Sequence, residues 1–192
     1  MEDFVALALQ LGFTCAAPLD PAALSVREEV RDMCAADKCR IYGRNWTCPP
    51  HCGTLEECRK RIAGTQAGLL VQTVGQLEDS FDFEAMAETE KLHLAHFHAL
   101  ADLLREKEPG VLCLGSGGCR LCAGCAYPEP CRFPERACPS MEGYGLLVND
   151  ACGAAGVPYY HGSNTLAYTA CYLFPHKNGV TAKIVCCPGP RP

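Results

Sequence analysis

One cysteine-dense run constrains this chain more than any other feature. Residues 113–134 read CLGSGGCRLCAGCAYPEPCRFP. The run approaches the bacterial ferredoxin pattern C-x2-C-x2-C-x3-C-P, whose thiolates hold a [4Fe–4S] cluster. It differs from that pattern in two ways. Five residues instead of three separate the last two cysteines, and two residues lie between the last cysteine and the following proline. We therefore predict an iron–sulfur site whose four ligands are Cys119, Cys122, Cys125 and Cys131.

Zinc is the alternative metal for this run. Structural zinc sites usually combine two separated Cys-x2-Cys pairs into one tetrahedron. Here three cysteines are crowded at x2 spacing and the fourth follows closely, which favours the iron–sulfur interpretation.

A second cysteine group lies upstream, where residues 34–58 read CAADKCRIYGRNWTCPPHCGTLEEC. Thr54 and Glu57 have the spacing of a capping box, so a helix should begin at Leu55 and place Cys58 in its first turn, where backbone NH groups favour a thiolate. We predict a second iron–sulfur site, again with zinc as the alternative. Its predicted ligands are Cys34, Cys39, Cys48 and Cys58, and the choice between Cys52 and Cys58 for the last position stays open.

Composition narrows the class of protein. The chain has 192 residues, 48% of them hydrophobic, and no apolar run approaches the ~20 residues of a membrane helix. A net charge of -5 argues against a nucleic-acid partner. The acidic start is a poor signal peptide, so we expect a cytoplasmic protein whose 16 cysteines bind metal rather than form disulfides.

Hydrophobic patterning predicts an α/β or α+β fold in one domain, 1–192, with a small mixed sheet, helices and two cysteine-rich loops, the second ferredoxin-like. Helices are predicted over 1–14, 25–33 (capped by Asp20 or Ser25), 82–108 and 139–156, and strands over 68–74, 111–114, 165–174 and 180–186. Residues 68–115 form a βαβ-like core in this scheme, followed by a C-terminal helix and hairpin over 139–187.

Other side chains near the cysteines have weaker assignments. His93, His96 and His98 share the long helix; we expect core or partly exposed residues, with metal binding as the alternative. Tyr42 and Trp46 beside the first group, and Tyr127 within the second, could shield a metal site from water. Eight cysteines remain outside the two predicted sets: Cys15, Cys52, Cys113, Cys138, Cys152, Cys171, Cys186 and Cys187.

The two cysteine groups and the Pro-Ser-Met-Glu segment 139–142 together give a family resemblance over about residues 30 to 170. The chain resembles the "predicted metal-binding protein" family, domain of unknown function 2284. The resemblance implies metal or iron–sulfur binding and supplies no reaction. It would place an arginine where this sequence has Cys138.

These features favour a two-cluster iron–sulfur protein, suited to an anaerobic cell, that relays electrons to or from a partner oxidoreductase. No flavin, nicotinamide or nucleotide motif is recognisable, so bond-making chemistry would lie on the partner. One alternative is an iron–sulfur enzyme with an open iron that binds a small, possibly sulfur-containing substrate. Another is a zinc-stapled interaction module.

Overall fold

The computed structural model describes residues 1–176. Cys186, Cys187 and the predicted strand 180–186 therefore lie outside the described residues. The helices and strands, in chain order, are α1 (Glu2–Gln10), β1 (Cys15–Leu19), η1 (Pro21–Ala23), α2 (Glu28–Ala35), α3 (Leu55–Ala63), β2 (Thr65–Gln76), α4 (Phe83–Lys107), β3 (Leu112–Leu114), η2 (Glu142–Tyr144), α5 (Val148–Ala154) and β4 (Thr165–Pro175). This content confirms the predicted α/β class.

The four strands form one sheet in the order β1-β2-β4-β3, and every neighbouring pair is antiparallel. The long strands β2 and β4 pair along most of their length, from Thr65 opposite Pro175 to Gln76 opposite Thr165. The elements β2, α4 and β3 follow one another as the predicted βαβ-like unit does. Strand β4 lies between β2 and β3, so the unit is split, and no two neighbouring strands within residues 1–176 are parallel.

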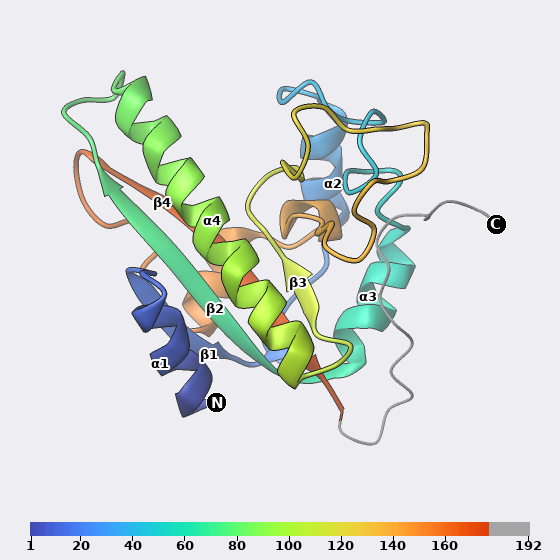
Figure 1. Cartoon of the computed structure of the whole chain (residues 1–192), viewed down its shortest axis with the longest axis horizontal. Coiled ribbons are helices and arrows are strands. Elements are labelled where there is room, and N and C mark those ends of the chain that lie inside the picture. Colours follow the sequence, from blue (N-terminus) through green and yellow to red (C-terminus); the bar gives the residue numbers. More distant parts are fainter. Residues whose placement is uncertain (177–192) are drawn as a thin grey trace.

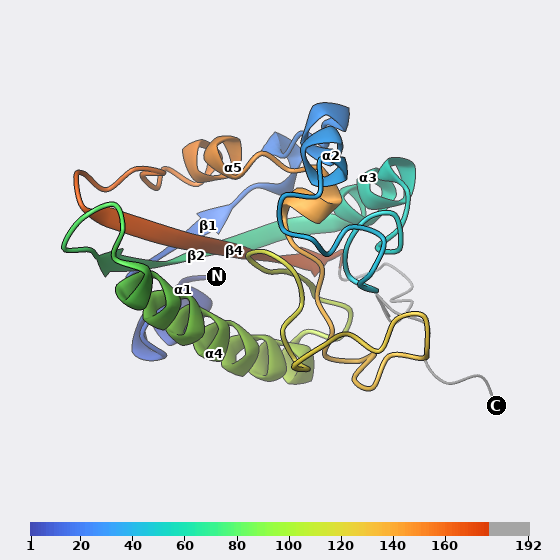
Figure 2. The same cartoon turned by 90° about the horizontal axis from the view of Figure 1, so that it is seen from above.

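Each face of the sheet packs a separate hydrophobic core, because side chains alternate along a strand. Leu69 and Val71 of β2 face α1 and α4, where they meet Phe97 and Leu100. The intervening Leu70 faces the other core, whose members include Cys58, Tyr144 and Ala151. Figure 1 shows α4 running along the sheet, and Figure 2 shows α1 and α4 on one face with α2 and α5 on the opposite face.

The predicted helix over 139–156 is wrong as a single element. The chain forms η2, then turns at Gly145, and begins α5 at Val148. Gly145 has φ of +77°, and a Cβ there would lie 2.9 Å from the carbonyl oxygen of Arg27. Close packing against the start of α2 therefore interrupts the helix at position 145, where only glycine fits easily.

The N-terminal third holds two further differences. Strand β1 was not predicted; it is an edge strand, which tolerates Pro18 within it. The predicted caps for α2 are also wrong, because α2 begins after Arg27 without a side-chain cap and Asp20 instead accepts a hydrogen bond from Ala22 in η1.

The capping box predicted at the start of α3 is confirmed. The Thr54 hydroxyl accepts a hydrogen bond from the Glu57 backbone NH at 3.2 Å, and the Glu57 carboxylate accepts one from the Thr54 backbone NH at 2.7 Å. Within residues 1–176, no helix combines the length and the apolar character needed to cross a bilayer.

Candidate metal centre

The two cysteine-rich loops meet at one end of the sheet. In both views the loop between α2 and α3 lies beside the loop that follows β3 (Figures 1 and 2). The Trp46 indole donates a hydrogen bond to the Glu129 carbonyl at 2.8 Å, and its ring packs edge-on against Tyr127 at 5.0 Å. His51 adds a further ring contact to Tyr127 at 4.3 Å. Segments about 80 residues apart in the chain are thereby held together.

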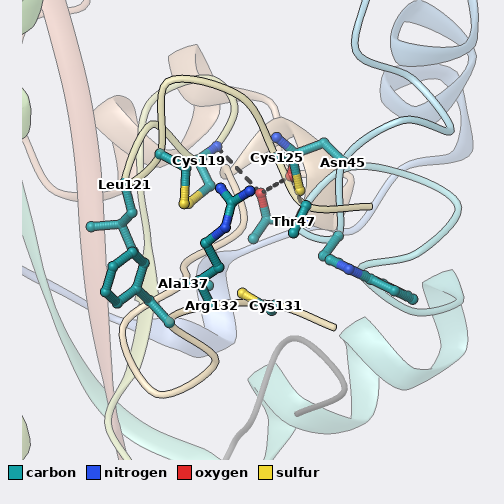
Figure 3. Close-up of a pocket in the computed structure, with 12 residues that line it drawn as sticks. Asn45, Thr47, Cys119, Leu121, Cys125, Cys131, Arg132 and Ala137 are labelled. Atoms are coloured by element: carbon teal, nitrogen blue, oxygen red, sulfur yellow. Dashed lines mark hydrogen bonds between the residues drawn. The ribbon is translucent and has the colours of Figure 1, made fainter. Parts of the chain in front are cut away.

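All four cysteines predicted for the second group line one cavity, together with Thr47 and Trp46 of the other loop. Figure 3 shows Cys119, Cys125 and Cys131 around this space. The cavity is narrow, with a volume of about 20 Å³. Trp46, which we expected beside the first group, belongs to this second cavity.

Two backbone hydrogen bonds reach the Cys119 sulfur. Hydrogen bonds from the Leu121 and Cys138 backbones lower the pKa of its thiol, but burial outweighs them and raises the pKa to about 11. The Cys119 NH donates to the Thr47 hydroxyl at 3.3 Å, which fixes this backbone against the other loop. NH-to-sulfur hydrogen bonds of this kind stabilise metal-bound thiolates and tune their clusters.

Three of the four cysteines predicted for the first group, Cys34, Cys39 and Cys48, line a second cavity of about 170 Å³. Its walls also include Tyr42, as expected for a residue that shields the site. Burial raises the pKa of the Cys48 thiol to about 12. Metal binding to these thiols would therefore have to displace their protons.

Cys58, the fourth predicted ligand, does not line this cavity among the described residues, and neither does Cys52. Cys58 is 0% exposed and packs into the hydrophobic core on the α5 side of the sheet. The Arg31 guanidinium lies 3.5 Å from the sulfur of Cys58 and 3.5 Å from that of Cys52. Arg31 lies three residues before Cys34 on α2, and this positively charged neighbour was missed from the sequence.

An open groove of about 540 Å³ connects the two groups. Cys39 of the first group lines it together with Cys119, Cys122 and Cys125 of the second. The glycines that follow β3, Gly117 and Gly118, form part of its wall. The two cysteine groups are therefore neighbours on one surface.

In the part of the chain that the structure describes, the cysteines line cavities, and their sulfur atoms do not converge on one position where a single metal ion could bind. Between residues 1 and 176, no group of three or more His, Cys, Asp or Glu side chains converges closely enough to hold one metal ion. All fourteen cysteines in this part of the chain are free thiols. Several thiols around one cavity suit an inorganic core in which different irons take different thiolates.

The structure adds two polar groups that sequence reasoning did not assign. Glu142, the last residue of the Pro-Ser-Met-Glu segment, lines the first cavity. Near the second group, the Arg105 guanidinium of α4 lies 3.0 Å from the Cys138 sulfur. A hydrogen bond with the Cys113 thiol, followed by the charge of Arg105, lowers the pKa of Cys138. An arginine from another element thus reaches the position where the resemblance would place one.

Fold and site together define a cysteine-rich α/β protein of metal-binding type. The family model described as "Predicted metal-binding protein (DUF2284)" matches residues 17–174. The chain belongs to this family, which confirms the resemblance drawn from its two cysteine groups. Comparisons with curated proteins and with solved structures gave no match.

Proposed function

We propose that this protein binds two [4Fe–4S] clusters, one at each cysteine group, and relays electrons to or from a partner oxidoreductase in the cytoplasm. The observation that carries the proposal is the shared groove, because Cys39 of one group and Cys119 of the other line it. Electron transfer between two centres requires them to be close together. A cluster would supply one-electron redox chemistry at each position.

The protein's own residues have distinct parts in this proposal. Cys119, Cys122, Cys125 and Cys131 would hold one cluster, and Cys34, Cys39 and Cys48 would provide thiolates for the other. Backbone NH groups at the Cys119 sulfur and the charge of Arg31 beside the first group would stabilise the more negative, reduced state. The rings of Trp46, His51 and Tyr127 pack against one another at the junction of the loops, where they would limit access of water to a bound cluster.

A second candidate function rests on the first cavity. Only three of its predicted thiols line it, so a cluster there could leave one iron without a thiolate. Such an iron can act as a Lewis acid toward a small substrate, and the protein would then be an enzyme.

The test is the iron, zinc and acid-labile sulfide content of anaerobically purified protein, with visible and EPR spectra before and after dithionite. About eight irons and eight sulfides per chain, with absorbance that bleaches on reduction, is the expected result. About four would limit the proposal to one group. Stoichiometric zinc without sulfide would refute it and support a zinc-stapled module instead.

A further inference from the structure

The first cavity contains one carboxylate that faces its three thiols. Besides Cys34, Cys39 and Cys48, its described lining comprises Ile41, Tyr42, Pro49, Gly117, Gly118, Ser140 and Glu142. Glu142 is thus the only charged side chain in that lining. The thiols come from α2 and the loop after it, whereas the carboxylate comes from η2, more than 90 residues later.

One oxygen of this carboxylate lacks a partner. Glu142 accepts hydrogen bonds from the Ser140 hydroxyl and from its own backbone NH, but its Oε2 atom is buried without a hydrogen-bond partner. The carboxylate is close enough to Cys34 to raise the pKa of that thiol by charge repulsion, an effect second only to burial. A buried, unsatisfied carboxylate oxygen is costly, and a cation in the cavity would remove that cost.

The thiol predicted for the fourth position is held elsewhere. Cys58 lies in the hydrophobic core on α3, with Arg31 against its sulfur. Cys52 donates to the Gly143 carbonyl at 3.3 Å and contacts the same guanidinium. Moving the Cys58 sulfur into the cavity would break its contact with Arg31 and unpack part of the core, and moving the Cys52 sulfur would break its contacts with Gly143 and Arg31.

We infer that the Glu142 carboxylate, and not the Cys58 thiolate, completes the ligand set of the first site with Cys34, Cys39 and Cys48. The inference rests on the proposed function, since it assumes that the cavity holds an iron–sulfur cluster. Iron accepts oxygen as well as sulfur ligands. A carboxylate is a harder, less polarisable ligand than a thiolate. In such a cluster, one iron would carry an oxygen ligand from Glu142, and the thiolates of Cys34, Cys39 and Cys48 would bind the others.

The test isolates the first site by using the full chain with Cys119→Ser and Cys122→Ser, so that bound iron reports on the first group alone. Glu142→Ala and the matched Cys58→Ser are then introduced separately into this parent. The measurements are iron and sulfide per chain, iron retained after a chelator challenge, and the EPR spectrum of the reduced protein. Circular dichroism checks that each variant is folded.

The expected result is that Glu142→Ala lowers iron retention by more than about tenfold while Cys58→Ser matches the parent. Glu142→Gln, which keeps the side-chain volume, should lose iron as Glu142→Ala does, and Glu142→Cys should regain it with an altered EPR spectrum. Loss of iron from Cys58→Ser with retention in folded Glu142→Ala would overturn the inference. A parent without iron or sulfide would refute a first-site cluster itself, and the inference would fall with that part of the proposed function.

Discussion

At the residue scale, His93 shows how burial sets the charge of a side chain. It is 0% exposed, its Nδ1 lies 3.0 Å from the Thr73 hydroxyl, and its ring packs against Phe13. Burial lowers its pKa from 6.5 to about 4, with a further decrease from the charge of His96. His93 is therefore a neutral core residue in the described structure, as expected for at least part of the histidine group.

Acid should destabilise the fold through His93. Between pH 6.5 and about 4 the unfolded chain binds a proton at this position and the folded chain does not, so the free energy of unfolding falls as the pH falls. The pKa of His93 falls from 6.5 in the unfolded chain to about 4 in the folded chain. This difference corresponds to a loss of about 3 kcal/mol in the free energy of unfolding once the pH is below both values. Urea unfolding across this range should show a shallower pH dependence for His93→Gln than for the wild type.

Measurements at pH 8 provide the control for His93→Gln. At pH 8 His93 is neutral in both states, so the two proteins should then differ only by the cost of the substitution itself. Parallel profiles from pH 8 down to pH 4 would contradict this role of His93.

The sequence predicted site residues whose partners lie nearby in the chain, and it missed those that folding brings together from distant segments. The spacing of Cys119, Cys122, Cys125 and Cys131 is local, and the structure brings these four thiols around one cavity. Glu142 reaches the first group from a distant segment, which spacing does not encode, and the contacts of Arg31 with Cys52 and Cys58 depend on how the intervening loop folds back on α2. Cys58 is the instructive case, because helix capping correctly placed it on α3 but could not show that its side chain enters the core.

At the element scale, the position of α3 depends on its capping box. Thr54→Ala removes the hydroxyl that accepts from the Glu57 NH, and we expect it to lower the free energy of unfolding by about 1 kcal/mol. Thr54→Ser keeps this oxygen and should stay close to the wild type. Chemical denaturation of both variants checks the prediction, and equal stabilities would contradict it.

The packing of α4 on β2 depends on the absence of a side chain at Gly75. A Cβ there would lie 2.2 Å from the Oγ1 atom of Thr89 on α4. Gly75→Ala should therefore force the helix away from the strand and destabilise the protein by about 1–3 kcal/mol.

Gly153 provides the matched control for this substitution. It lies within α5, and a Cβ there would have no neighbour within 4 Å. Gly153→Ala should be neutral or stabilise the fold by up to about 1 kcal/mol, because alanine favours the helix. Thermal unfolding of the two variants should give shifts of opposite direction, and a loss of the same size in both would show that the contact with Thr89 is unimportant.

The elements themselves were predictable where one periodicity extends over many residues. The long helix 82–108 and the strand 165–174 match α4 and β4 to within a residue or so. Strand β1 is short and contains Pro18, so its pattern resembles a loop until β2 pairs with it. The break at Gly145 arises from contact with Arg27, a tertiary cause that helix propensity does not include.

At the scale of the whole molecule, the sheet and the cysteine loops have different sources of stability. The sheet lies between two hydrophobic cores, whereas the loops are joined by a few contacts such as those of Trp46 with Glu129 and of Cys119 with Thr47. Segments with few buried apolar contacts open more readily than the core. Metal binding should therefore order the loops more than it orders the sheet.

Hydrogen exchange of metal-loaded and chelator-treated protein tests this division. We expect loading to slow exchange in residues 36–54 and 115–139 by about tenfold or more, because the thiolates of each loop would be held by that loop's own rigid inorganic core. Amides of β2 and β4 should change far less, since their hydrogen bonds lie within the sheet. The Cys119→Ser and Cys122→Ser double variant should lose the effect in 115–139 and keep it in 36–54. Equal protection of the sheet and both loops would show instead that metal and fold form one cooperative unit.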